Sequence, residues 1–143
     1  MLHKKTEKGQ AIILIVFAIT GLIGLTALTV DGGMAYDDHR HAQNAADSAA
    51  FAAALANAKG ENLETAALDI ATSNGYTDDG ANTIVDVTII NAPSGTCLDD
   101  SGVPIPNSKE ITVDITSNVE TFFAPVIGIR TVTNRVTATT RSC

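Results

Sequence analysis

The first half of the chain is dominated by an uninterrupted apolar run. Residues 11–30 contain no charged residue, no Pro and no Asn. Because an α-helix rises about 1.5 Å per residue, a helix over this run would be about 30 Å long, which is the thickness of a bilayer core. The pattern therefore predicts a transmembrane helix over residues 10–33, following a basic leader or flank at residues 1–9.

A cleaved secretory signal is the alternative interpretation of the same run. The apolar core of such a signal has about 7–15 residues and is followed by a cleavage site of small residues. Residues 11–30 exceed that length, and the segment Gly33-Met34-Ala35 is a poor match to such a site. We therefore favour a helix that stays in the membrane.

Alanine is the commonest residue in the segment after the apolar run. Residues 35–58 contain neither Pro nor Gly, and Ala has the highest helix propensity. We therefore predict a helix over about residues 35–58 that continues the first one into a long rod. Gly32 and Gly33 lie at the junction, where they predict a bend or a local loosening, because Gly disfavours helix interiors.

One face of this Ala-rich helix carries small side chains at steps of three, four or seven residues, which places them along one stripe. These positions are Ala35, Ala42, Ala45, Ala46, Ala49, Ala53 and Ala56. A small-residue stripe allows a partner helix to approach closely. It equally suits packing against the protein's own domain, since a helix that covers a sheet also needs an apolar face. The sequence leaves both interpretations open.

The hydrophobic period changes in the second half of the chain. A short amphipathic helix is expected over about residues 61–74, with a stop at Asn74 and Gly75. Three segments rich in Val and Thr then alternate apolar and polar residues, which predicts strands at about residues 83–90, 110–119 and 131–139. The expected fold class is α+β, with the long N-terminal helix packed on a small, mostly antiparallel sheet.

The distribution of charge orients the predicted span. Residues 1–9 contain three lysines and one glutamate, whereas the whole chain has a net charge of −7. Positive flanks stay in the cytoplasm. We therefore expect a single-pass protein of the inner or cytoplasmic membrane, with a cytoplasmic N-terminus and residues 34–143 forming a domain outside. An acidic body of this kind does not attract nucleic acid.

Residues with catalytic or metal-binding potential form no recognisable site in the sequence. Residues 37–41 include two Asp and two His, but on a helix only Asp37 and His41 share a face, and a metal needs further donors. The sequence contains no nucleophile elbow, phosphate loop or HExxH motif. We expect neither an enzyme nor a cofactor.

A long loop and two cysteines are the remaining candidate features. Residues 91–109 are rich in Pro, Gly, Ser and Asp, which predicts an exposed loop suited to a contact surface. Cys97 lies in this loop, and Cys143 follows the third predicted strand. Because the domain is expected outside the membrane, we favour a disulfide over free thiols, worth about 4 kcal/mol by chain entropy.

The N-terminal region carries a series of residues in a fixed order. Lys8-Gly9-Gln10 precedes the apolar run, and the residues that follow it are Val30, Asp31, Gly33, Tyr36, Gln43, Asn44, Ala45, Ala46 and Asp47. This combination resembles the N-terminal region of the TadE/TadG-like proteins of the tight-adherence (Flp) pilus system. The segment 118–140, which contains Phe122-Phe123-Ala124, also resembles that family.

The resemblance implies a pilin-like membrane protein that helps to assemble a surface pilus or forms part of one. Its partners would be copies of itself or related pilins, bound through the N-terminal helix, together with the membrane and the pilus assembly machinery. Prepilins are cut after a Gly by a dedicated peptidase, and Gly9-Gln10 is the placement that precedes the span. Leu14 stands where pilins usually carry Glu.

Two classes of function follow from these features. The first is a structural, pseudopilin-like subunit or assembly component of a Tad/Flp-type pilus, found in the membrane or exported in an extracellular filament at the cell surface. The second is a membrane-tethered envelope or adhesion module that does not polymerise and binds a partner through its sheet and the loop at residues 91–109.

Overall fold

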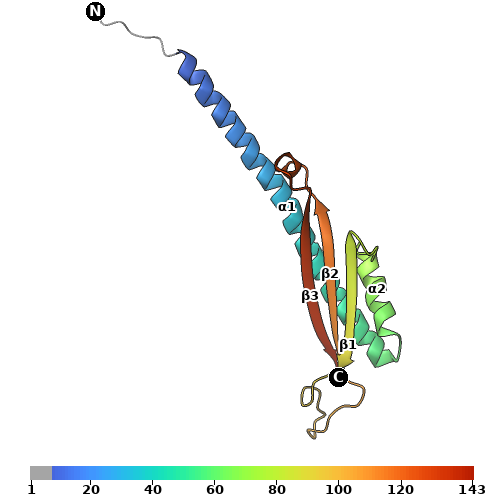
Figure 1. The fold of residues 1–143 in the computed structure, drawn as a ribbon. Coiled ribbons are helices and arrows are strands. Elements are labelled where there is room, and N and C mark those ends of the chain that lie inside the picture. The colour runs from blue at the N-terminus through green and yellow to red at the C-terminus, as the bar shows by residue number, and fades with distance from the viewer. Residues whose placement is uncertain (1–7) are drawn as a thin grey trace, which may run out of the picture.

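A single long helix, α1 (Lys8–Lys59), is the longest element of the fold. The structure is a computed structural model that describes residues 8–143, so residues 1–7 of the expected basic flank lie outside the described residues. The N-terminal part of α1 projects away from the rest of the fold, and its C-terminal part carries the sheet (Figure 1). The long rod that the sequence predicts is therefore present.

The remaining elements are one helix, three strands and a short 3₁₀ helix. In chain order they are α2 (Leu63–Ser73), β1 (Thr83–Asn91), β2 (Lys109–Glu120), the 3₁₀ helix η1 (Ala124–Ile127) and β3 (Thr131–Ser142). The strands form one antiparallel sheet in the order β1-β2-β3. The predicted α+β fold class, with a long apolar N-terminal helix and a small sheet, is confirmed.

The fold has two layers, with the helices on one face of the sheet. α1 packs on β2 and β3, and α2 packs on β1 and on α1; Figure 1 shows both helices on the same side. The strand register aligns Val85, Ile115 and Val136 in one row across the sheet. These side chains are buried because the two-residue alternation turns them all toward the helices.

The Ala stripe of α1 lies in the core of the protein's own domain. Ile111, Val113 and Ile115 of β2 have no exposed surface and belong to the same buried cluster as the alanines. Ala35 is half-buried. The other members of the stripe are 0–2% exposed: Ala42, Ala45, Ala46, Ala49, Ala53 and Ala56. Of the two interpretations that the sequence left open, the structure shows packing against the chain's own sheet, and this surface is not free for a second chain.

At Gly32 and Gly33, where the sequence predicted a bend or a local loosening, α1 continues without interruption. Each Gly costs about 1 kcal/mol relative to Ala in a helix interior. Contacts on both sides offset this cost: Asp31 is hydrogen-bonded to the connection between β2 and β3, and Ala42 and the alanines after it are buried under the sheet. Tertiary contacts therefore override the local propensity.

Beyond α1, two element boundaries differ from the sequence expectation by more than one residue, for identifiable reasons. α2 begins at Leu63 instead of residue 61, because the Asn62 side chain accepts a hydrogen bond from the backbone N–H of Thr65 at 2.8 Å and so caps the helix. β3 extends to Ser142, beyond the expected end at residue 139, because its pairing with β2 continues to Lys109.

Enlarging a buried alanine should destabilise the domain. Ala46→Leu or Ala49→Leu adds three carbon atoms where no surface is exposed, and overpacking of this kind costs about 1–3 kcal/mol. We expect a lower free energy of unfolding in urea, measured on the full chain in detergent by circular dichroism. Ala58→Leu is the matched control, since Ala58 is exposed on the same helix. Equal midpoints for all the variants and the parent would contradict the packing described here.

Candidate membrane and assembly surface

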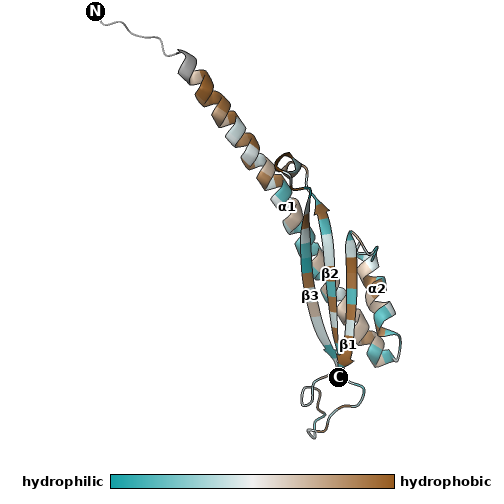
Figure 2. Ribbon diagram, viewed as in Figure 1, coloured by the Kyte–Doolittle hydropathy of each residue, from teal (hydrophilic) through white to brown (hydrophobic). Residues whose placement is uncertain are grey.

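The N-terminal part of α1 presents apolar side chains on all sides. Residues 11–30 are exposed throughout, except for Ala27, which is half-buried. Twelve large apolar residues in this segment are exposed: Ile12, Ile13, Leu14, Ile15, Val16, Phe17, Ile19, Leu22, Ile23, Leu25, Leu28 and Val30. Figure 2 shows this end of α1 as predominantly hydrophobic, where it projects from the domain. The helix is long and apolar enough to cross a membrane.

The few polar side chains of this segment are satisfied within the helix. The hydroxyl groups of Thr20, Thr26 and Thr29 donate to the backbone carbonyl oxygens four residues earlier, at 2.8–2.9 Å. A hydroxyl without a partner would be costly in a bilayer, where water is absent. The segment is therefore compatible with a lipid environment along its whole length.

Asp31 ends the apolar segment and ties α1 to the connection between β2 and β3. It is only 7% exposed. Its carboxylate accepts hydrogen bonds from the backbone N–H groups of Phe122 at 2.9 Å, Phe123 at 3.1 Å and Ala124 at 2.7 Å. These N–H groups lie at the start of η1, where the helix itself offers them no partners. One carboxylate therefore satisfies three donors and fixes η1 against α1.

An apolar groove of about 510 Å³ lies between α1 and η1. The α1 side of the groove runs from Thr20 to Asp31, and the other side is formed by Phe123, Val126 and other residues of η1. Almost all of its lining is apolar. The sequence predicted neither this groove nor the position of η1.

Some of the residues after Asp31 that carry the resemblance lie on the surface, and others contact the rest of the domain. Gly33 and Tyr36 are exposed, as are Asn44 and Asp47. Gln43 connects helix and sheet, because its side-chain amide donates to the Asp47 carboxylate at 3.1 Å and to the backbone carbonyl oxygen of Thr137 at 3.3 Å. Within this motif, Asp31 and Gln43 thus hold the two layers together, and the exposed members remain free for contacts.

Asp38 is a positioning residue that the sequence did not reveal. Its carboxylate accepts hydrogen bonds from Tyr76 at 3.0 Å, Ser117 at 2.5 Å and Asn134 at 2.7 Å, which come from three different parts of the chain. Burial of Tyr76 and its hydrogen bond to Asp38 raise the pKa of the phenol, so the phenol stays neutral and donates. Only the folded chain brings these partners together.

His41 has a structural role in this fold. Its Nε2 atom lies 2.9 Å from the backbone carbonyl oxygen of Asn74, to which it donates, and its ring packs against Tyr76 with centroids 5.6 Å apart. Asp37, its neighbour on the helix face, is exposed. Over residues 8–143, the His, Cys, Asp and Glu side chains form no group of three or more arranged to hold a metal ion.

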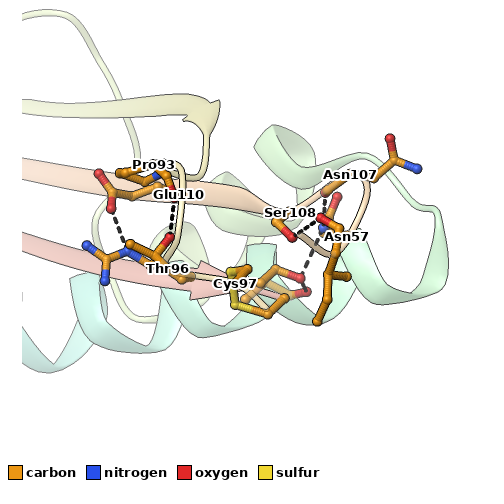
Figure 3. The surroundings of a disulfide bond; sticks show 12 residues. Asn57, Pro93, Thr96, Cys97, Asn107, Ser108 and Glu110 are labelled. Carbon is orange, nitrogen blue, oxygen red and sulfur yellow. Dashed lines mark hydrogen bonds and ion pairs between the residues drawn. A yellow bond between two sulfur atoms is a disulfide. The ribbon is translucent and has the colours of Figure 1, made fainter. Parts of the chain in front are cut away.

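The loop between β1 and β2 lies at the end of the domain farthest from the apolar segment, next to the chain's C-terminal end (Figure 1). Cys97 in this loop forms a disulfide with Cys143, with Cα atoms 5.3 Å apart. Figure 3 shows Asn57 of α1 beside the disulfide, where its amide donates to the Asn107 carbonyl oxygen at 3.2 Å. A crosslink over 46 residues is worth about 4 kcal/mol by chain entropy. The loop is thus fastened to both layers.

The expected peptidase site lies at the start of α1. Gly9 and Gln10 belong to the first turn of the helix, which begins at Lys8. Cleavage between them would leave the apolar segment 11–30 as the N-terminal end of the helix.

The long helix also matches a known family. Residues 9–57 match the family model described as "Putative Flp pilus-assembly TadE/G-like". Over this segment, which is about a third of the chain, the protein is similar to TadE/TadG-like proteins. The match covers nearly all of α1 and stops before the sheet, so the resemblance at residues 118–140 lies outside it. Searches of curated proteins and of solved structures returned no match.

The matched family associates residues 9–57 with assembly of the Flp pilus. It also associates the protein with the membrane and the pilus machinery. The shared N-terminal region includes Asp31, so the matched segment contains both the apolar helix and the carboxylate that fixes η1.

Removing the Asp31 carboxylate should release η1. In Asp31→Ala the N–H groups of Phe122, Phe123 and Ala124 lose their acceptor, and each lost bond to a charged group costs about 1.5–3 kcal/mol. Hydrogen–deuterium exchange of the peptide spanning η1 should therefore accelerate about tenfold or more. Asp37→Ala, at an exposed position of the same helix, is the control and should leave exchange unchanged. Unaltered exchange in Asp31→Ala would show that this contact does not hold η1.

Proposed function

We propose that this protein is a TadE/TadG-like, pseudopilin-like subunit or assembly component of a Tad/Flp-type pilus. In this proposal α1 anchors the chain in the cytoplasmic membrane and later packs against the helices of other copies or of related pilins. The proposal rests on a contrast along α1. Residues 11–30 are exposed and apolar, whereas the Ala stripe in the C-terminal half of the helix is buried under the sheet.

Because the Ala stripe is buried, we place the proposed assembly surface on the N-terminal segment, residues 11–30. Gly21 supports this placement, because a Cβ atom added there would meet nothing within 4 Å in the monomer. The fold itself therefore gives no reason for a small residue at this position. Small residues on apolar helices do allow partner helices to approach closely. The segment 11–30 thus offers lipid contacts before assembly and helix contacts afterwards.

The proposed topology places the N-terminus in the cytoplasm and the sheet domain outside. Lys4, Lys5 and Lys8 precede the apolar segment, and positive flanks favour the cytoplasmic side. The disulfide between Cys97 and Cys143 supports the same orientation, because disulfides persist in oxidising compartments outside the cytoplasm. Cleavage after Gly9 would remove the whole basic flank and free the helix for export.

A membrane-tethered binding module is the second candidate, and the loop between β1 and β2 favours it. This loop is fastened by the disulfide and exposes Leu98 and Val103, which are 44% and 55% accessible. A rigid, partly apolar tip far from the membrane is suited to contact with another envelope protein. In this alternative α1 would remain surrounded by lipid.

Photocrosslinking in living cells distinguishes the two candidates. We expect that benzoylphenylalanine in place of Phe17, which is 73% exposed, crosslinks to other copies or to related pilins. The same probe in place of Ile84, on the open face of the sheet, is the control for random encounters. Immunoblotting and mass spectrometry identify the products.

The pilus-subunit proposal is contradicted if Phe17 yields no protein crosslinks in cells that make pili. Crosslinks to a foreign envelope protein from a probe at Val103, together with none from Phe17, would favour the tethered module. Comparable expression of all variants is checked by immunoblot.

A further inference from the structure

The connection between β2 and β3 is unusually apolar for an exposed loop. Residues 121–129 contain no charged side chain. Five of its large apolar residues are exposed, with Val126 reaching 90%: Phe122, Phe123, Val126, Ile127 and Ile129. Contiguous apolar surface of this kind is costly in water and marks a contact site. The charged residues Glu120 and Arg130 flank the loop on its two sides.

This loop lies beside the apolar segment of α1 and not beside the polar part. The α1 side of the groove runs from Asp31 back to Thr20. The eleven residue-to-residue steps between them cover about 16 Å of helix, which is about half the thickness of a bilayer core. If residues 11–30 cross the membrane with the sheet domain outside, η1 therefore lies at the depth of the outer leaflet.

The N–H groups of the loop are largely paired, as a membrane requires of non-helical chain. Irregular backbone is tolerated at membrane depth only where its polar groups have partners. The N–H groups of Phe122, Phe123 and Ala124 bond to the Asp31 carboxylate, and Pro125 has no N–H. Three further N–H groups bond within the loop: Val126 to Phe123, Gly128 to Pro125 and Ile129 to Ala124, at 3.0–3.1 Å.

Polar groups in the turn that closes η1 also have hydrogen-bond partners. Gly128 adopts a positive φ of 91° that suits glycine, which lets the chain reverse directly after Ile127. The Thr121 hydroxyl donates to the carbonyl oxygen of Ile129 at 2.7 Å, and the Thr121 N–H donates to that of Arg130 at 3.0 Å. These polar groups thus bond within the protein, while the large apolar side chains of the loop are exposed.

We propose that the loop at residues 121–130 is a second membrane-inserted element, with a lipid acyl chain of the outer leaflet filling the groove between η1 and α1. The proposal rests on the proposed function for the position of α1 in the membrane. Lipid is the occupant because the groove is continuous with the exposed span, and the medium that surrounds residues 11–30 also reaches Ile23 and Leu28 in the groove. Arg130 would lie at the level of the headgroups.

Two membrane contacts would fix the orientation of the sheet domain. A single helix lets a domain rotate about the helix axis, whereas a second inserted loop at one side selects one orientation. The Asp31 carboxylate would couple the two contacts, since it bonds α1 directly to the first turn of η1. The loop would lose its lipid contacts when the subunit leaves the membrane.

Single-tryptophan variants test this proposal, because the chain contains no Trp of its own. Val126→Trp reports on the loop, Phe17→Trp on the span, and Val103→Trp on the distant β1–β2 loop as the aqueous control; all three side chains are exposed in the monomer. The full chain is placed at one copy per lipid nanodisc. Quenching is then measured with brominated phosphatidylcholine and with aqueous acrylamide.

The expected result for Val126→Trp is a blue-shifted emission that brominated lipid quenches strongly and acrylamide quenches weakly, as for Phe17→Trp. Quenching by acrylamide as strong as for Val103→Trp, with Phe17→Trp still in lipid, would overturn the inference and leave the span intact. Strong quenching of Phe17→Trp by acrylamide would place this residue in water and would overturn the proposed span as well. Protection of Val126→Trp only in nanodiscs holding several copies would show that a second chain, and not lipid, fills the groove.

Discussion

The close contact between the Ala stripe of α1 and the apolar face of β2 is the constraint on which the rest of the structure depends. Side chains as small as Ala46 and Ala49 let the sheet approach the helix axis. The larger branched side chains of Ile111 and Ile115 fill the space between the layers from the strand side. This contact uses one face of one part of α1. The apolar surface of residues 11–30 lies outside this contact, and it is long enough to cross a membrane.

Asp31 marks the boundary between these two uses of α1. Residues before it are apolar on every side of the helix, and the buried stripe of the domain follows it. Its carboxylate bonds three N–H groups of the β2–β3 connection, so the position at which the helix leaves the span is also the position at which the sheet is attached. This role gives a physical reason for an acidic residue directly after Val30, in a region that matches the TadE/TadG-like family.

Patterns of short range made much of the fold predictable from the sequence. The uncharged run 11–30, the Ala-rich helix and the alternating strands each depend on neighbouring residues, so their type and approximate limits follow from periodicity. The sequence did not predict continuity at Gly32, the partners of Asp38 or the location of η1, because these depend on contacts between residues far apart in the chain. The small-residue stripe was ambiguous for the same reason: helix–helix and helix–sheet packing favour the same alanines.

In the proposed function, α1 serves first as a membrane anchor and then as the packing helix of an exported assembly. Intact-mass spectrometry of sheared cell-surface material, compared with the membrane fraction, tests this claim most directly. The account predicts a sheared species that begins at Gln10, the residue after the expected peptidase site. Full-length chain found only in the membrane fraction, in cells that carry pili, would contradict it.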